Sequence, residues 1–253
     1  MSGQQTFRSD ARLWFDRRFQ SATATHSLYC FPFAGGSATY YAAWDRYFTG
    51  RVELVPVQLP GRGARMTEPP ATDLCALADE LAEVIAGEPT EAMLFGHSMG
   101  AILAFEVGRR LTAMGRPARH LFVTGRPAPP IVRPREPVSG LPRAEFLRML
   151  RDYGAADEAV FAHDDLLDLL IPMIRADFAM IENYRRRPGP RLTCPVTAWC
   201  GDDDPGVPPS AMVPWGDETS GPFTLTVLPG GHFFLTEHHA AVARCVNTAI
   251  RGL

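Results

Sequence analysis

The chain has 253 residues, of which 46% are hydrophobic, and a formal net charge of −3. That length suits one large α/β domain or two small ones, and the apolar fraction is sufficient for a substantial core. A slightly acidic charge balance does not indicate a nucleic-acid-binding protein. All 25 basic residues are arginine, which we interpret as a bias of coding or lineage.

The cysteines and the N-terminus indicate the cellular compartment of the protein. The five cysteines are widely spaced and include no C-x-x-C pair, which argues against a disulfide framework or a zinc site and favours a reducing compartment. The N-terminal 20 residues are polar and charged, and no apolar run approaches the roughly 18 residues of a membrane helix. We therefore expect a cytoplasmic protein with no metal site and no membrane contact.

Short β-like runs alternate with longer helical patterns, which predicts an α/β fold with a mostly parallel, doubly wound sheet. Helices are expected at Thr72–Ala86, Met99–Met114 and His238–Ile250. Most of the expected strands are apolar on both faces, as buried parallel strands are. They are Leu28–Phe31, Val52–Val57, Ala92–Phe95, His120–Thr124, Val196–Cys200 and Thr224–Leu228.

The region from Pro127 to Arg191 breaks this alternation, because its patterns are helical and no strand signal interrupts them. Its longest pattern, "DDLLDLLIPMIRADFAMIENY", contains Pro172, which should start or kink a helix. We interpret 127–191 as a helical lid inserted over the carboxyl edge of the sheet, within a single domain of residues 1–253. Extra helical packing on the sheet is the alternative.

The string "LFGHSMGA" places Ser98 in a G-x-S-x-G motif between an expected strand and an expected helix. In this context the motif forms a sharp turn that exposes a nucleophilic serine, and Gly96 and Gly100 remove the side chains that would obstruct it. The neighbouring His97 points elsewhere, because consecutive side chains diverge around a tight turn. We expect it to have a supporting or packing role.

A serine nucleophile needs a base and a group that orients the base. Of the seven histidines, His232 in "VLPGGHFFL" follows the last expected strand, and two glycines there allow the ring to turn back across the sheet edge. The preceding expected strand ends in "GDDDP", so the acid is Asp202, Asp203 or Asp204, and spacing does not choose among them. The order serine, aspartate, histidine is that of the α/β-hydrolases.

An oxyanion requires backbone donors as well. In "LYCFPFAGGSA", the residues Ala34, Gly35 and Gly36 follow the first expected strand and would let the backbone approach a substrate closely. A plain turn is the alternative for this Gly-Gly pair. Nucleotide binding is disfavoured, because the loop has neither G-x-G-x-x-G nor G-x-x-x-x-G-K-[ST].

Together, "CFPFAGGSA", "VQLPGRGAR", "LFGHSMGA", "GDDDP" and "LPGGHFFL" resemble, in this order, the type II thioesterases, which are editing hydrolases of polyketide and nonribosomal peptide assembly lines. The likeness runs from about Ser27 to the C-terminus. It implies an α/β-hydrolase fold with Ser98 as nucleophile and His232 as base. It also selects Asp204 as the acid, with Asp202 in reserve, and the amides of Ala34 and Met99 as oxyanion donors.

The resemblance further implies a reaction and a partner. The substrate would be an acyl thioester on the phosphopantetheine arm of an acyl or peptidyl carrier protein, and the enzyme itself would need no metal or organic cofactor. Within the expected lid, Met173, Ile174, Phe178 and Ile181 are candidates to line an acyl chamber, although such residues more often serve plain helix packing. The run 185–187 of three arginines would steer a carrier or simply be solvated, and a monomer is the simplest assembly.

Three other functions fit the same residues. An acyl-CoA thioesterase or esterase would use the same triad without a carrier partner, and a non-catalytic member of the fold would only bind. A cyclising or product-releasing thioesterase domain is the third, although the start at Met1 favours a free-standing protein.

Overall fold

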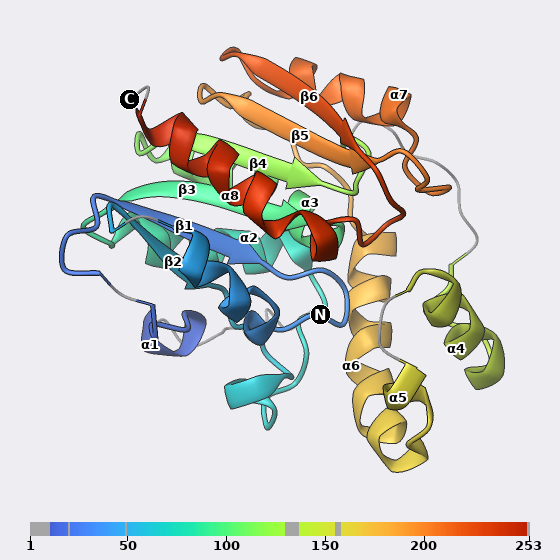
Figure 1. Cartoon of the computed structure of the whole chain (residues 1–253). Coiled ribbons are helices and arrows are strands. Elements are labelled where there is room, and N and C mark those ends of the chain that lie inside the picture. Colours follow the sequence, from blue (N-terminus) through green and yellow to red (C-terminus); the bar gives the residue numbers. More distant parts are fainter. Residues whose placement is uncertain (1–10, 20, 49, 130–136, 155–157, 252–253) are drawn as a thin grey trace.

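The computed structural model describes residues 11–19, 21–48, 50–129, 137–154 and 158–251. Its centre is a six-stranded sheet in the order β2-β1-β3-β4-β5-β6, and every neighbouring pair is parallel (Figure 1). The strands are β1 (His26–Phe31), β2 (Val52–Pro56), β3 (Glu91–His97), β4 (His120–Thr124), β5 (Val196–Gly201) and β6 (Phe223–Leu228). The predicted α/β fold with a parallel sheet is confirmed, and each expected strand is present.

Helices cover both faces of the sheet, as a doubly wound fold requires. The α-helices of the two layers are α2 (Leu74–Ala86) and α3 (Met99–Ala113) on one face and α8 (Leu235–Arg251) on the other, where α8 packs against the 3₁₀ segment η1 (Ala38–Tyr47). Because successive side chains of a strand alternate between faces, Tyr29 of β1 lies in the α2–α3 core and Leu28 in the α8 core. Shorter elements are α1 (Ala11–Trp14), η2 (Gly63–Arg65), α7 (Pro209–Met212) and η3 (Val213–Glu218).

Two helices begin at residues other than those expected. The carboxylate of Asp73 accepts hydrogen bonds from the amides of Cys75 (2.8 Å) and Ala76 (3.0 Å), so α2 begins after this cap rather than at Thr72. The helix expected from His238 instead begins at Leu235, because turn hydrogen bonds after residue 231 already wind the chain. His238 then departs from helical geometry, with φ −113° and ψ 16°.

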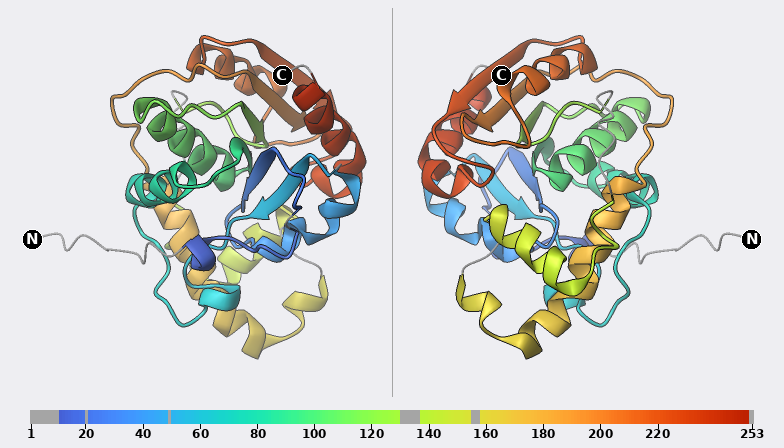
Figure 2. Two further views of the ribbon diagram at one scale, coloured as in Figure 1. Left: turned by 90° about the vertical axis from the view of Figure 1, so that its left-hand side faces the viewer. Right: turned by 90° about the vertical axis from the view of Figure 1, so that its right-hand side faces the viewer.

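Between β4 and β5 the described residues form three helices and no strand: α4 (Arg143–Asp152), α5 (Glu158–Phe161) and α6 (Asp164–Glu182). They pack on one another around a core of their own that includes Phe146, Phe161, Leu167 and Ile171. Figures 1 and 2 show them together beyond the carboxyl ends of the strands. Pro172 lies in the interior of α6. Residues 130–136 and 155–157 of the expected insertion, like residues 1–10, lie outside the described residues.

Two further findings concern the chemistry of the whole chain. All five cysteines are free, and four of them are buried. Within the described ranges, no helix combines the length and the hydropathy needed to cross a membrane.

Candidate active site

Ser98 occupies a strained turn between β3 and α3. Its φ of 53° and ψ of −115° make it the one residue other than glycine with positive φ among the described residues. Such a conformation is costly for a residue with a Cβ and marks functional turns. Although Ser98 sits at the N-cap position, its hydroxyl makes no capping bond to α3, so the oxygen is available to other partners.

The glycines of the motif make this turn possible. A Cβ on Gly96 would lie 2.1 Å from the carbonyl oxygen of Gly100, and a Cβ on Gly100 would lie 2.2 Å from the carbonyl oxygen of Phe31. Both neighbours are backbone atoms, which cannot rotate away as a side chain can. The expected role of the two glycines is therefore explained by direct steric contact.

We expect Gly96→Ala to lower the free energy of unfolding by about 3 kcal/mol or more, because the new methyl group has no space without a backbone shift. Urea denaturation measures this value. Gly140→Ala is the matched control, since nothing lies within 4 Å of a Cβ built there, and its change should stay within about 0.5 kcal/mol. Equal stability of the two variants would contradict the steric account of the turn.

His232 and Asp204 form a hydrogen-bonded pair at the same edge of the sheet. The Nδ1 of His232 lies 2.7 Å from Oδ2 of Asp204, which is 5% exposed, and the other carboxylate oxygen accepts from the amide of Gly206 at 2.8 Å. Burial acts to raise the pKa of Asp204, but the hydrogen bond and charge of His232 and the amides of Gly206 and Val207 hold it below the ordinary value of 3.8. Asp204 is therefore an anion at neutral pH.

Neither of the other two acids of the turn has a described hydrogen bond or ion pair with the histidine. Asp202 accepts a hydrogen bond from the amide of Gly230 at 2.9 Å, which holds the loop that carries His232. Asp203 is exposed. Of the three acids that the sequence left open, the structure therefore places Asp204 against the ring.

His232 stands beside the turn that carries Ser98. The His232 and His97 rings lie 5.0 Å apart between centroids. A Cβ on Gly125 would lie 2.5 Å from the His97 ring and 3.5 Å from the His232 ring. Among the described contacts, no hydrogen bond joins Ser98 to His232. In resting enzymes such bonds are often long and tighten with substrate.

His97 has the packing environment that we expected. It is fully buried, and its Nδ1 lies 2.8 Å from the hydroxyl oxygen of Thr124. Burial, together with the neighbouring His232, holds the pKa of His97 well below 6.5, so the ring is neutral. It packs against the rings of Phe33 (5.8 Å) and Phe233 (5.3 Å), which also contact each other at 4.9 Å, and this cluster joins the loops that follow β1 and β6.

The loop after β1 forms a tight turn beside this cluster. The amide of Gly36 donates to the carbonyl of Phe33 at 2.8 Å, and Gly35 has φ +79°, as the third position of a type II turn requires. Among the described residues, the amides of Ala34 and Met99 donate to no protein acceptor. Met99 is the first residue of α3, where amides lack helical partners.

Comparison with known proteins decides the family. The model of the thioesterase domain family matches residues 26–250. The chain belongs to the thioesterase family. The type II thioesterase BorB of the borrelidin biosynthetic cluster is 41% identical, with a TM-score of 0.86 over 96% of this chain and 99% of its own. Thioesterase PikA5 of Streptomyces venezuelae is 39% identical over 90% of this chain and 82% of its own length.

These likenesses confirm the resemblance to type II thioesterases and the enzyme class, thioester hydrolase. One relative carries a name that states another reaction. Linear gramicidin dehydrogenase LgrE of Brevibacillus parabrevis is 36% identical over 98% of this chain and 96% of its own length. The present chain has no G-x-G-x-x-G motif of dinucleotide-binding proteins.

In the thioesterase, the residues expected to line an acyl chamber lie on α6 in different surroundings. Ile174 is half-buried and would contact a Cβ built on Gly35 at 3.2 Å, which places it against the turn after β1. Phe178 packs edge-on against Phe146 of α4 at 5.7 Å. Met173 is buried, and Ile181 packs at the margin of the main core. Ile174 is therefore the one of the four with a described contact to the active-site loops.

A cavity of about 630 Å³ opens on the histidine side of the thioesterase site. It lies between the C-terminal end of α4 and the loops after β5 and β6, and its lining includes Tyr153, Asp204 and His232 but not Ser98. The Tyr153 ring meets His232 edge-on at 5.4 Å between centroids. A volume of this size is typical of small-molecule sites. Tyr153 belongs to no sequence motif, so its position beside His232 could not be predicted.

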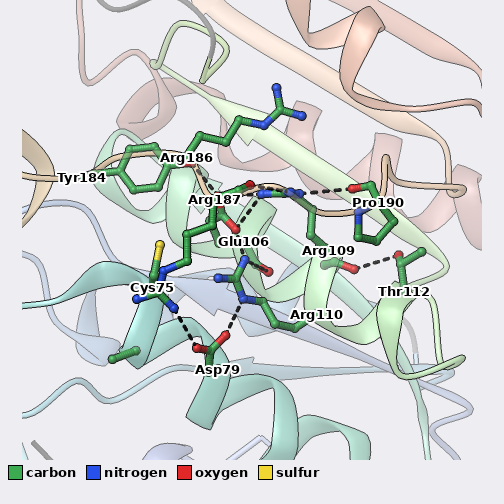
Figure 3. Close-up of polar contacts among 12 residues, drawn as sticks. Cys75, Asp79, Glu106, Arg109, Arg110, Thr112, Tyr184, Arg186, Arg187 and Pro190 are labelled. Carbon is green, nitrogen blue, oxygen red and sulfur yellow. Dashed lines mark hydrogen bonds and ion pairs between the residues drawn. The ribbon is translucent and has the colours of Figure 1, made fainter. Parts of the chain in front are cut away.

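The arginines of the run 185–187 form ion pairs and hydrogen bonds with other residues of this chain. Arg186 pairs with the buried carboxylate of Glu218 at 2.7 Å, and Arg187 pairs with Asp79 at 3.3 Å. Beside them, Glu106 of α3 is fully buried and binds Arg109 and the hydroxyl of Tyr184 (2.6 Å) (Figure 3). These contacts fasten the chain after α6 to α2 and α3. Among the described residues, Arg185 donates only to backbone carbonyls, and all three arginines are exposed, so steering of a partner by this run stays a prediction.

Proposed function

We propose that the thioesterase hydrolyses acyl thioesters on the phosphopantetheine arm of carrier proteins. By doing so it would remove aberrant or stalled acyl groups from a polyketide or nonribosomal peptide assembly line. The observation that carries this proposal is the buried Asp204–His232 pair beside the strained Ser98 turn, in a chain 41% identical to a type II thioesterase. The single domain, with α4–α6 as its lid, and the triad roles below are parts of the same proposal.

In the first step, Ser98 Oγ attacks the thioester carbonyl while Nε2 of His232 takes its proton. Asp204 holds the opposite nitrogen as a donor and stabilises the imidazolium that forms. The amides of Ala34 and Met99 bind the tetrahedral oxyanion, since neither donates to an acceptor in the part of the chain that the structure describes. The C–S bond then breaks, and His232 protonates the departing thiolate of the arm.

In the second step, His232 takes a proton from water, which attacks the acyl ester on Ser98. The second tetrahedral intermediate uses the same two amides. When it collapses, the proton returns from His232 to Ser98 Oγ and the free acid leaves. All proton transfers use side chains of this chain, and the prosthetic arm belongs to the carrier.

The cavity of about 630 Å³ beside His232 is a candidate site for the arm. It reaches the base and the acid without including Ser98, so an arm in it would approach the nucleophile from the histidine side. The acyl group would then lie toward α6, where Ile174 contacts the turn after β1. We propose Ile174 as a lining residue of the acyl site, with Met173 and Phe178 supporting it from the same helix.

The competing function is that of an acyl-CoA thioesterase or simple esterase with the same triad. Comparing kcat/KM for one acyl group on a carrier protein, on coenzyme A and on nitrophenol separates the two. We expect the carrier substrate to exceed both others by at least about tenfold, which corresponds to roughly 1.4 kcal/mol of additional transition-state binding. Equal or faster turnover of acyl-CoA would favour the competing function.

A further inference from the structure

A buried ion pair joins three distant segments around the turn after β1. The guanidinium of Arg62 binds both carboxylate oxygens of Asp177, at 2.6 Å and 2.7 Å, and the two residues are 4% and 1% exposed. Arg62 lies in the "LPGRG" loop after β2, and Asp177 lies in the C-terminal half of α6. Neither residue belongs to the proposed triad or to the proposed oxyanion donors.

Both partners also hold the backbone of the turn. Oδ2 of Asp177 accepts a hydrogen bond from the amide of Gly35 at 2.8 Å, and NH1 of Arg62 donates to the carbonyl of Gly36 at 2.9 Å. Two consecutive residues of the turn are therefore fixed from one side by a rigid, bidentate pair. The amide of Ala34, one residue earlier, is the proposed oxyanion donor.

The hydrogen bond to Gly35 decides the orientation of the peptide between Ala34 and Gly35. A turn of this kind has an alternative form in which that peptide is rotated, and glycine at the third position makes both forms accessible. The rotated peptide would direct the Ala34 carbonyl oxygen, instead of the Gly35 amide, at the carboxylate of Asp177. Two like partial charges would then face each other, so the ion pair disfavours the rotated form.

Such a pair is poorly explained by stability alone. Removing two charges from water is costly, and replacing a buried ion pair by apolar residues of similar volume is often neutral or stabilising. A role in fixing the geometry of a turn explains why two charges are buried here.

We infer that Arg62 and Asp177 are positioning residues of the oxyanion site. By bonding the Gly35 amide and the Gly36 carbonyl, they fix the backbone that directly follows Ala34, and this holds the Ala34 amide of the preceding peptide in place for the oxyanion. Through Asp177 they also attach α6 of the lid to that turn. The inference rests on the proposed function only for the identity of Ala34 as a donor. Because an oxyanion exists only in the transition state, the pair should affect kcat and leave KM nearly unchanged.

The first test measures kcat and KM for a nitrophenyl acyl ester, which needs no carrier protein. Asp177→Asn replaces one acceptor oxygen with a donor that faces Arg62, and it should lower kcat by about 10- to 100-fold, part of the loss expected for a missing oxyanion donor. KM should stay within about twofold. Arg62→Lys, which cannot form the bidentate contact, should act in the same direction.

Glu106→Gln is the matched control. It also leaves a buried arginine, Arg109, beside an amide instead of a carboxylate. The site of the change lies about 12 Å along α3 from Ser98, at a rise of 1.5 Å per residue. We expect it to lower Tm as Asp177→Asn does, with kcat within about twofold of the wild type.

A second variant separates positioning from stability. Arg62→Met/Asp177→Leu removes both charges, so no unpaired charge remains buried and Tm should recover relative to Asp177→Asn. The bonds to Gly35 and Gly36 are still absent, so kcat should remain low. If kcat recovers together with Tm, the two residues have a merely structural role and the inference is wrong.

Ala34→Pro tests the donor itself. Proline removes the amide hydrogen and is favoured at the second position of a type II turn, so the turn should persist while kcat falls about 10²-fold or more. Adding Asp177→Asn to Ala34→Pro should then produce little further loss, because both act through one amide. If the fold-losses in kcat of the two single substitutions multiply in the double variant, the inference is wrong. Wild-type kcat in Ala34→Pro would overturn the donor assignment, whereas failure of the wild type on acyl-carrier substrates would overturn only the proposed function.

Discussion

Ser98→Ala should lower kcat for an acyl-carrier thioester by at least about 10⁴-fold, because no other group can form the acyl-enzyme. The residual rate would come from binding and from the oxyanion donors acting on water. The serine sits in the strained turn between β3 and α3 and has no capping bond to the helix. The measurement is release of free acid, with circular dichroism to show that the variant is folded.

An active-site phosphonate provides the control for this prediction. It should label the wild type and Ser21→Ala, whose hydroxyl bonds to the carbonyl of Gly50 in a loop before β1, but not Ser98→Ala. Labelling of Ser98→Ala to the same extent would identify another nucleophile. A folded wild type that takes no label would favour a non-catalytic binding protein of this fold.

Asp204→Asn should lower kcat by about 10⁴-fold, although the side chain keeps its shape. The amide can donate to Nδ1 of His232, which stabilises the wrong tautomer and leaves Nε2 protonated toward Ser98. The wild-type carboxylate stays ionised at neutral pH, because its hydrogen bonds hold the pKa below 3.8 despite burial. Steady-state kinetics at pH 7 measure the effect.

Asp203→Asn is the matched control for Asp204→Asn, because it removes the same charge one residue away at an exposed position. Its kcat should stay within about threefold of the wild type, as expected for an exposed charge outside the hydrogen-bonded pair. A larger loss from Asp203→Asn than from Asp204→Asn would show that the acid is assigned to the wrong residue.

The sheet and the nucleophile turn could be predicted from the sequence because their signals are local. A buried parallel strand is a short apolar run, and G-x-S-x-G requires its glycines for steric reasons that involve only neighbouring backbone. The first residue of α8 was harder to predict from the sequence. Hydrogen bonds in the turn after Gly231 start the helix before the residues whose periodicity marked it.

The acid could not be chosen from spacing alone, because three aspartates share one turn. Their difference arises from the loop after β6, which brings His232 to Asp204 and binds Asp202 through the amide of Gly230. Such a choice depends on how two loops far apart in sequence meet. The resemblance to type II thioesterases indicated Asp204 where the residues alone did not.

The pair Arg62–Asp177 was missed for a related reason. The sequence "VQLPGRGAR" contributed to the family resemblance, but no function could be predicted for Arg62 from it. The partner of Arg62 lies 115 positions away in the chain. One signal was available. Asp177 falls between the buried Met173 and Met180 on the inward face of α6, and an acid at such a position requires a buried partner.

The most direct test of the account is to trap the acyl group on the enzyme. The wild type is mixed with an acyl-carrier protein, quenched in acid within one turnover, digested and analysed by mass spectrometry. We expect the mass of the acyl group on Ser98, with none on Ser98→Ala. Release of free acid with no acyl group on Ser98 at any time, or with the group on another residue, would contradict the account.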